Sequence, residues 1–236
     1  MKWRSLQESD SYRDVRSLRE IFSERKELIA KYVPADVQAV HARAVAVLKA
    51  QRVATNALRV GAKCPSFELP DHNGKLVSSA ELLAKGRLVI LFIRGRWCPF
   101  CVGQMEAMSF IGAEIEAAGG SLVAVSPQTQ KQAFFMRAQH KLCFPLLVDA
   151  HNQLARQFGL VYRVSEEQQA LYSRTFVNLP FVNGDSGWEL PIPATFVIDR
   201  DGAIVFASAN EDYMERPEPL EILSLFRDDS AGPRLL

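Results

Sequence analysis

Two segments near the start of the sequence have the spacing of amphipathic helices. Between residues 10 and 32, apolar side chains recur along one face, with charged residues between them. The second segment, 35 to 56, is rich in alanine and follows Pro34, which ends the first helix. The expected apolar stripes are Val15, Leu18, Phe22 and Ile29, then Val37, Val40, Ala44 and Val47. We predict an N-terminal helical hairpin that packs against the remainder of the chain or against a second copy, with His41 as a packed residue beside the stripe.

From residue 60 onward, short apolar runs alternate with helical patterns. The composition changes at Val60-Gly61-Ala62-Lys63-Cys64-Pro65, where we place a domain boundary. Strands are expected at 88–93, 121–126, 144–149, 194–199 and 203–207. Helices are expected at 78–85, 102–118, 129–140, 152–158 and 217–226. This alternation is typical of an α/β fold with a covered sheet. The predicted division is a helical hairpin extension (1–59), an α/β domain (60–227) and a tail (228–236).

The stretch from 160 to 190 shows little regular pattern. It holds several aromatic residues among turn-forming dipeptides, such as Asn183-Gly184 and Ser186-Gly187. A connection of this length inside a compact domain is often a binding loop or lid, although aromatic residues also fix a loop to the surface. Both interpretations remain open at the level of sequence.

The bulk composition narrows the class of protein. The 236 residues are 48% hydrophobic and 23% charged, which suits one domain with an appendage. The formal net charge is +1, so no bulk field attracts nucleic acid or an anionic membrane. The first residues carry acid early and lack the apolar core of a signal peptide, and no apolar run has the length of a membrane span. We therefore expect a cytoplasmic protein with neither nucleic acid nor membrane as a partner.

Two cysteines, Cys98 and Cys101, lie where the first long apolar strand meets the start of a helix. A thiol reacts as its thiolate, which at Cys98 is favoured by the N–H groups and dipole of the helix start and by nearby Arg94 and Arg96. Cys98 is therefore predicted to be the exposed nucleophile. Cys101 shares its helix face with residues that must meet the sheet, namely Met105, Met108 and Ile115. Cys101 is therefore predicted to be the recessed, resolving thiol.

The surroundings of the pair favour redox chemistry over metal binding. Trp97 would shield the pair and offer a flat apolar contact, and Pro99 suits the first helical turn. Zinc uses the same cysteine spacing, but it needs two more ligands and the sequence has no second close pair. We expect no metal and no cofactor, and we interpret Cys64 and Cys143 as small core residues.

These residues resemble a known family. The apolar strand before Trp97-Cys98-Pro99-Phe100-Cys101, and the later run Ile-Pro-Ala-Thr-Phe-Val-Ile-Asp-Arg-Asp-Gly at 192–202, are similar to the peroxiredoxin-like branch of the thioredoxin superfamily, the alkyl hydroperoxide reductase/thiol-specific antioxidant family. The similarity covers about residues 60 to 227. It implies a thioredoxin-like fold, with a mixed central sheet covered by helices. It also implies that Pro193 is a cis-proline held against the cysteine pair.

The chain departs from the family pattern at positions that bear on peroxide chemistry. The Pro-x-x-x-Thr/Ser-x-x-Cys motif fits in neither register, whether counted back from Cys98 or from Cys101. The second arginine of peroxidases normally stands where this chain has Pro193, so only Arg94 or Arg96 could polarise a peroxide. In ordinary thioredoxins a buried aspartate lies six residues before the first cysteine, and that position holds Phe92 here.

The sequence thus predicts a thiol–disulfide oxidoreductase in which Cys98 attacks and Cys101 resolves. One alternative is a thiol-dependent peroxidase that reduces hydrogen peroxide or alkyl hydroperoxides through a sulfenic acid on Cys98. A second alternative, from a different class, is a non-enzymatic redox-sensing or partner-binding module. The expected partners are a thiol or disulfide protein or a peroxide substrate, and a homodimer is one assembly that the hairpin would allow.

Overall fold

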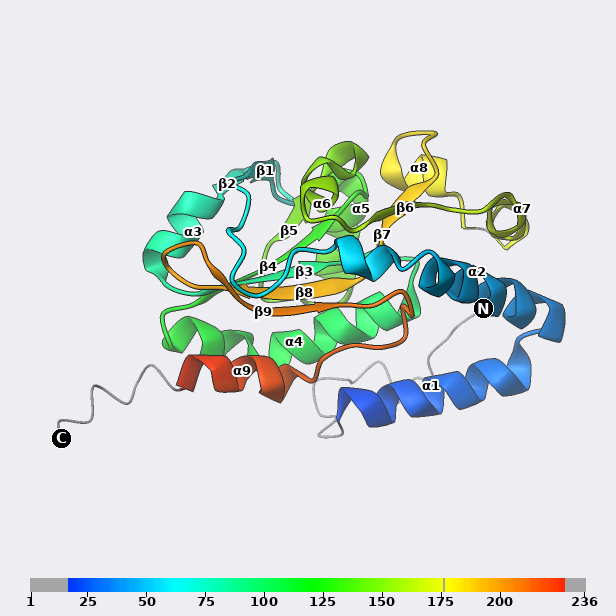
Figure 1. Ribbon diagram of the computed structural model, residues 1–236, viewed down its shortest axis with the longest axis horizontal. Helices are drawn as coiled ribbons and strands as arrows, with labels where there is room; N and C mark the ends of the chain where they lie inside the picture. The colour runs from blue at the N-terminus through cyan, green and yellow to red at the C-terminus, as the bar shows by residue number, and fades with distance from the viewer. Residues whose placement is uncertain (1–16, 176, 228–236) are drawn as a thin grey trace.

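A mixed five-stranded sheet forms the centre of the protein (Figure 1). The computed structural model describes residues 17–175 and 177–227. The sheet has the strand order β5-β4-β3-β8-β9. The strands are β3 (Leu88–Phe92), β4 (Ser121–Ser126), β5 (Leu146–Val148), β8 (Ala194–Ile198) and β9 (Ile204–Ala209). Strand β3 pairs with β4 in parallel and with β8 antiparallel, and all five of its residues are buried. The predicted α/β class with a mixed central sheet is confirmed.

Helices cover both faces of the sheet. The helices of the predicted domain are α3 (Ser79–Lys85), α4 (Pro99–Ala117), α5 (Gln130–Gln139), α6 (Gln153–Gln157) and α9 (Pro219–Arg227). Helices α4 and α9 lie on one face and α3 and α6 on the other (Figure 1). The alternation of side chains along β3 explains this division, because Leu88, Ile90 and Phe92 join one hydrophobic cluster while Val89 and Leu91 join the other. The predicted stripe of α4 faces this core, since Cys101, Met105, Met108 and Ile115 are all buried.

Short elements complete the sheet edges. The antiparallel pair β1 (Glu68–Pro70) and β2 (Leu76–Ser78) precedes α3, and the 3₁₀ helix η3 (Ala150–Asn152) precedes α6. The Ser78 side chain accepts a hydrogen bond from the backbone N–H of Ala80 and so caps α3.

The N-terminal segment forms two helices, as predicted. Helix α1 (Leu18–Tyr32) begins with a capping box between Ser17 and Glu20, and the carboxylate of Glu218 accepts hydrogen bonds from the N–H groups of Leu18 and Arg19, both at 2.9 Å. Helix α2 (Ala35–Ala50) is shorter than predicted and is followed by the 3₁₀ helix η2 (Val53–Asn56).

The predicted stripe of α2 is wrong at one position. The side chain of Val47 is 51% exposed, whereas Val40 and Leu48, eight residues apart, are buried. The face of α2 that packs therefore follows spacings of four residues, and Val47 lies outside it. The predicted position Val15 and the predicted tail 228–236 lie outside the described residues, and the domain division at residue 60 stays a prediction.

The prediction of little regular structure between 160 and 190 is wrong. Four short elements occupy this stretch, namely β6 (Val161–Arg163), α7 (Glu166–Arg174), α8 (Leu179–Asn183) and β7 (Glu189–Pro191). Strands β6 and β7 pair antiparallel, and the Ser165 side chain caps α7. Ser165 followed by two glutamates was a helix-start signal in the sequence, but the elements are too short for hydrophobic periodicity to reveal them.

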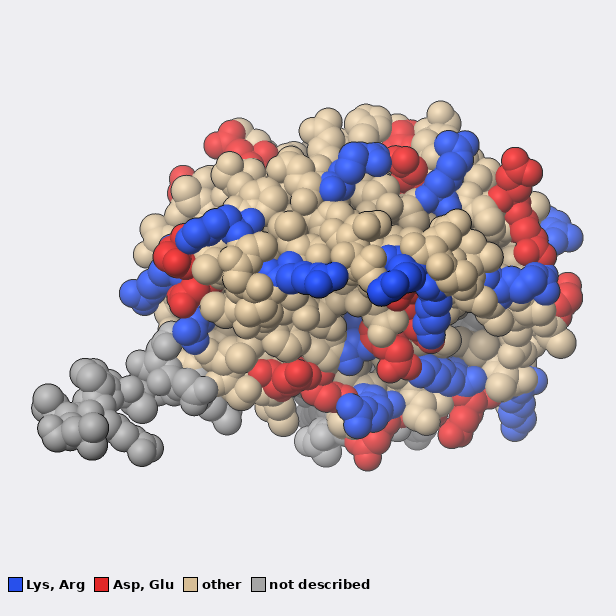
Figure 2. Space-filling model, viewed as in Figure 1, with Lys and Arg blue, Asp and Glu red and all other residues tan. Residues whose placement is uncertain are grey.

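The surface carries charges of both signs. On the face that Figure 2 shows, lysine and arginine side chains alternate with aspartate and glutamate over the same elements. Across residues 17–175 and 177–227, the structure contains no helix with both the length and the apolar character that crossing a membrane requires.

Gly159 offers a test of how the segment after α2 joins the domain. It has a φ of +72°, and a Cβ atom there would lie 2.0 Å from the carbonyl oxygen of Asn56. We predict that Gly159→Ala lowers the free energy of unfolding by about 3 kcal/mol, because it adds a backbone clash to the strain of a left-handed residue. Urea unfolding followed by circular dichroism measures the change.

Gly202→Ala is the matched control. Gly202 has a φ of +83°, and no heavy atom lies within 4 Å of the position of its Cβ. It should lose only about 1 kcal/mol, the strain of the backbone conformation alone. Equal losses in the two variants would show that the contact with Asn56 does not contribute to stability.

Candidate active site

The cysteine pair lies at the end of the central strand. After β3 the chain turns through Gly95, and Cys98 is the N-cap residue of α4, with Pro99 at the first helical position. The backbone N–H of Cys98 donates to the carbonyl of Gly95 at 3.1 Å, which closes the turn. Cys101 follows in the first turn of α4. Both thiols are free, so the structure shows the reduced pair.

The Arg94 side chain contacts the sulfur of Cys98. Arg94 is 3% exposed, and its Nη2 atom donates to Cys98 Sγ at 3.4 Å. The guanidinium carbon lies 4.6 Å from the ring centre of Trp97 and 4.0 Å from that of Tyr213. Contacts of this kind between a cation and aromatic rings hold the guanidinium in place beside the sulfur.

These contacts separate the two thiols electrostatically. Burial acts to raise the pKa of Cys98, but the hydrogen bond from the Cys101 side chain and the charges of Arg94 and Arg216 outweigh it and hold that pKa well below its usual value. Burial, the hydrogen bond to Cys98 and the negative charge of Cys98 raise the pKa of Cys101 well above its usual value. The local electrostatics therefore favour the thiolate form at Cys98 and the protonated form at Cys101.

Arg96 points away from the thiols. Its Nη1 atom donates to Gln132 Oε1 at 2.8 Å, and its guanidinium carbon lies 5.9 Å from the ring centre of Phe135 on α5. Of the two arginines in the motif, therefore, Arg94 alone has its side chain on the sulfur. The predicted place of Trp97 beside the pair agrees with its contact with Arg94.

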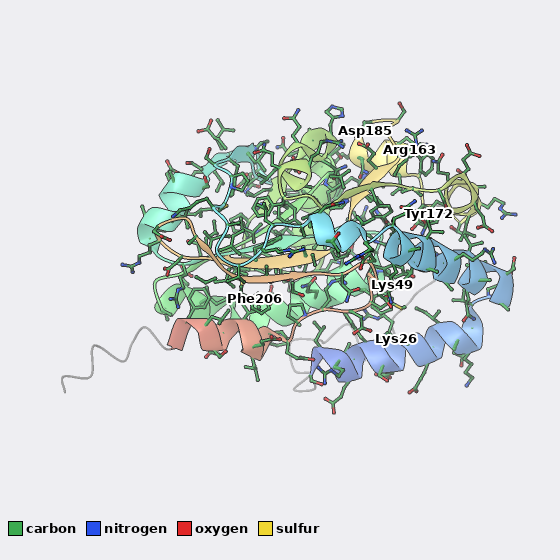
Figure 3. The ribbon with its side chains drawn as sticks, viewed as in Figure 1. Lys26, Lys49, Arg163, Tyr172, Asp185 and Phe206 are labelled. Atoms are coloured by element: carbon green, nitrogen blue, oxygen red, sulfur yellow. The ribbon has the colours of Figure 1, made fainter. Side chains whose placement is uncertain are left out.

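The expectation that Cys98 is exposed is wrong, since its exposed fraction is 0%. The rings of Trp97 and Tyr213 lie against the Arg94 guanidinium, and the rings of Tyr172 and His41 pack against these two. We refer to the four residues as the aromatic cover. The Trp97 and Tyr172 ring centres are 5.2 Å apart, and the His41 ring centre is 5.9 Å from that of Tyr172 and 6.2 Å from that of Tyr213. Tyr172 belongs to α7 and lies beside α2 (Figure 3).

The N-terminal hairpin completes this cover. From α1, Phe22 packs edge-on against Phe100, with ring centres 5.0 Å apart, and Arg25 donates to the carbonyl of Pro99. From α2, His41 reaches the tyrosines of the cover. Burial and the charge of Arg94 lower the pKa of His41 to about 4, so its ring is neutral at neutral pH. The hairpin packs as predicted, and the surface against which it packs is the cysteine site.

The expected cis bond before Pro193 is wrong. Across the described residues every peptide bond is trans, that between Ile192 and Pro193 included. The N–H of Ile192 donates to the carbonyl of Leu160 at 2.8 Å, and Ala194 pairs with Phe92 at the start of β8. The chain thus continues as extended backbone through Pro193. Because Ala194 pairs with Phe92, the last residue of β3, Pro193 still lies near the end of the central strand, where the turn to the cysteines begins.

The other two cysteines do not behave alike. Cys143 is exposed, so the interpretation of this residue as part of the core is wrong. Cys64 is half-buried, and burial raises its pKa to about 11. In the described part of the chain, no three histidine, cysteine, aspartate or glutamate side chains lie together as a metal site would require.

Sequence reasoning missed Arg216. This residue lies in the connection between β9 and α9, and its Nη2 atom approaches Cys101 Sγ at 3.9 Å. No local motif marks it. The signal that could have led to it is the proline at the position of the second peroxidase arginine, because an acidic thiol site that lacks one cation needs another from elsewhere in the chain.

The geometry brings two cysteine thiols and the Arg94 guanidinium together on a thioredoxin-like fold, an arrangement that suits a thiol-dependent oxidoreductase. Comparison with known proteins agrees. Residues 60–207 match the AhpC/TSA family, and the chain belongs to this family.

Individual relatives include both peroxiredoxins and disulfide oxidoreductases. A Mycobacterium tuberculosis protein whose name reads "Putative peroxiredoxin" is 28% identical over 156 residues, which are 66% of this chain and 88% of that protein. The thiol-disulfide oxidoreductase ResA of Bacillus cereus is 22% identical over 162 residues, covering 68% and 76%. The crystal structure of peroxidoxin BcpB from M. tuberculosis has a TM-score of 0.56 at 24% identity, over 72% of this chain and 97% of that one, and this likeness shows the fold alone.

The charge of Arg94 should control the titration of Cys98. Removing the cation favours the neutral thiol, so in Arg94→Met the lowest step in the ultraviolet absorbance of thiolates moves to higher pH. At a pH below that step, the fraction of Cys98 thiolate should fall about tenfold or more, because a hydrogen bond to a charged group contributes about 1.5–3 kcal/mol.

Arg96→Met is the control for this titration. This substitution also removes one positive charge, two residues further along the chain. The Arg96 side chain contacts Gln132 of α5 and not the thiols, so the titration step should stay where it is in the unmodified protein. An unchanged step in Arg94→Met, or equal shifts in both variants, would contradict the assignment of Arg94.

Proposed function

We propose that this protein is a thiol-dependent peroxidase that reduces small hydroperoxides, with Cys98 as the attacking thiolate and Cys101 as the resolving thiol. The observation that carries the proposal is the 3.4 Å contact from Arg94 Nη2 to the fully buried Cys98 Sγ. A guanidinium has five N–H donors in a fixed plane, so the group that stabilises the thiolate also has donors for an oxygen that approaches the sulfur.

Burial supports a small substrate. Neither sulfur is exposed, and the aromatic cover lies over Arg94 beside them. A disulfide of a folded protein must bring its own backbone to the attacking sulfur, whereas a hydroperoxide needs a passage only a few atoms wide. The apolar rings also exclude water, which strengthens the electrostatic contact between Arg94 and the reacting atoms.

In the first step the Cys98 thiolate attacks the outer oxygen of the hydroperoxide. The S–O bond forms as the O–O bond breaks, and the alkoxide leaves with the electron pair and takes a proton from water. Cys98 is oxidised to a sulfenic acid and the hydroperoxide is reduced to an alcohol, or to water in the case of hydrogen peroxide. Arg94 stabilises the negative charge as it moves from sulfur to oxygen.

In the second step Cys101 attacks the sulfur of the sulfenic acid. Its proton and the departing hydroxide form water, and a disulfide joins Cys98 to Cys101. Cys98 is the N-cap residue of α4 and Cys101 lies in its first turn, so the closure requires little movement of the chain. An external dithiol then reduces the disulfide and is itself oxidised to a disulfide.

A second candidate function is thiol–disulfide exchange, in which Cys98 attacks the disulfide of a partner and Cys101 releases the mixed disulfide. The hydrogen bond between the two thiols is compatible with this function, since the same arrangement serves either reaction. The likeness to ResA is consistent with it. This function would require the N-terminal hairpin to move, because both sulfurs are covered.

Stopped-flow kinetics on the reduced protein tests the proposal. Hydrogen peroxide and an alkyl hydroperoxide should each oxidise Cys98 rapidly, and Cys98→Ser should abolish this phase while Cys143→Ser leaves it intact. Arg94→Met should slow it about 100-fold, the typical loss when one donor to a developing negative charge is removed.

Reduction of insulin and of glutathione disulfide by the same preparation is the comparison. Peroxide oxidation no faster than in Cys98→Ser, together with rapid reduction of either disulfide, would contradict the peroxidase proposal and favour thiol–disulfide exchange.

A further inference from the structure

The Arg216 side chain is fixed by three separate contacts. Its Nε atom donates to Gln104 Oε1 at 2.9 Å, its Nη1 atom donates to the carbonyl of Glu215 at 2.7 Å, and its Nη2 atom points to Cys101 Sγ at 3.9 Å. Because each nitrogen has a different partner, the guanidinium is held in one orientation, with Nη2 directed towards Cys101 Sγ.

A buried polar chain supports this orientation. Gln104 lies three residues after Cys101 on α4 and is 1% exposed, and its Nε2 atom donates to Thr195 Oγ1 at 3.2 Å. Thr195 lies on β8 and is completely buried. Polar groups inside a core destabilise it unless every one is paired, so this chain from Thr195 through Gln104 to Arg216 is a specific arrangement directed at Cys101.

The site holds more positive than negative charge. In the described residues, no carboxylate forms an ion pair with Arg94 or Arg216, and the Cys98 thiolate is the negative charge beside both. The other titratable groups that influence the two sulfurs or Arg94 are His41, Tyr162, Tyr172 and Tyr213. All four are neutral at neutral pH, because burial lowers the pKa of His41 and raises the pKa of each tyrosine.

This balance changes when Cys98 reacts. As a thiolate, Cys98 accepts a hydrogen bond from Cys101 and repels a second negative charge, so Cys101 keeps its proton. As a sulfenic acid or a mixed disulfide, Cys98 is neutral, and two arginine charges then face Cys101 without an anion. The two arginines therefore stabilise the thiolate form of Cys98 before the reaction and the thiolate form of Cys101 after it.

We propose that Arg216 is a positioning residue for the second step: it stabilises the thiolate of Cys101 once Cys98 has lost its charge, and so allows Cys101 to attack Cys98. This inference rests on the proposed function for the sulfenic acid, although the same step occurs with a mixed disulfide. Arg216 would take over the task of the buried aspartate of thioredoxins, whose position is held here by Phe92. A cation promotes loss of the proton, where an aspartate would accept it.

Arg216 borders a cavity of about 360 Å³, open to solvent, together with Phe206, Ser208 and Asn210 of β9 and its following turn. Phe206 is labelled in Figure 3, between the sheet and α9. In this proposal, water that reaches Arg216 from the cavity takes the proton of Cys101. The hydroxide that leaves a sulfenic acid, or the thiolate that leaves a mixed disulfide, accepts that proton, so the step is balanced without a further acid or base.

Single-turnover kinetics tests the inference in two ways. In the first, hydrogen peroxide oxidises Cys98, and disulfide closure is the second phase. In the second, a methanethiosulfonate places a methylthio group on Cys98, and mass spectrometry follows the loss of methanethiol as Cys101 closes the disulfide. Cys64→Ser and Cys143→Ser are present in every protein, so that other thiols do not contribute.

We expect Arg216→Met to slow closure about tenfold near neutral pH in both measurements, and the rate to recover as the pH rises, because hydroxide then deprotonates Cys101 without help. Arg216→Lys, which retains the charge, should keep most of the rate. The peroxide phase should slow less than closure does, because Arg94 contacts Cys98 directly while Arg216 acts on that sulfur only through its charge. Gln104→Glu places a carboxylate beside Arg216 and should slow closure as well, even if Arg216→Met does not fold.

Closure at an unchanged rate in Arg216→Met and Gln104→Glu, or a slowing by the same factor at every pH, would overturn the inference. If peroxide gives no first phase but the methylthio protein shows the effect of Arg216, the peroxidase proposal fails and the role of Arg216 stands.

Discussion

The structure depends on the contact between the Arg94 guanidinium and the buried sulfur of Cys98. Moving a charge away from water is costly, so a buried thiolate requires a cation and hydrogen bonds close to it. Arg94 supplies both at Cys98, and its own charge is held between the rings of Trp97 and Tyr213. Arg94 follows the C-terminal end of the central strand β3. The chain then turns at Gly95, and α4 begins directly after Cys98. A change to any of these elements would alter the pairing.

Burial also decides which molecules reach the site. The aromatic cover draws on helices α2 and α7 and on the segment after β9, which are far apart in the sequence. The N-terminal hairpin therefore does more than extend the domain, because it forms part of the enclosure of the cysteine pair. The same enclosure makes the electrostatics strong, since few water molecules screen the two arginines from the sulfurs. In our proposal this enclosure accounts for the selectivity for small substrates, whereas hydrogen bonding and the charges of Arg94 and Arg216 make Cys98 acidic against the opposing effect of burial.

Local patterns in the sequence were enough to predict the central elements. The apolar strand 88–93, the stripe of α4 and the placement of Cys98 at a helix start all depend on neighbours in the chain, and the structure confirms them. Arg216 and the aromatic cover depend on tertiary contacts between distant segments, which leave no local signal. The trans bond at Pro193 departs from what the family resemblance implied. Helix α7 was missed because nine residues show too little periodicity.

Two cysteines of this chain allow a direct test of whether solvent exposure or nearby positive charge makes a thiol reactive. Cys143 is exposed, and Cys98 is completely buried beside Arg94. The most direct measurement treats the reduced protein with one equivalent of hydrogen peroxide and maps the first oxidised cysteine by mass spectrometry after rapid quenching. Our account predicts that Cys98 is oxidised first and is recovered in a disulfide with Cys101. Oxidation of Cys143 before Cys98 would contradict it.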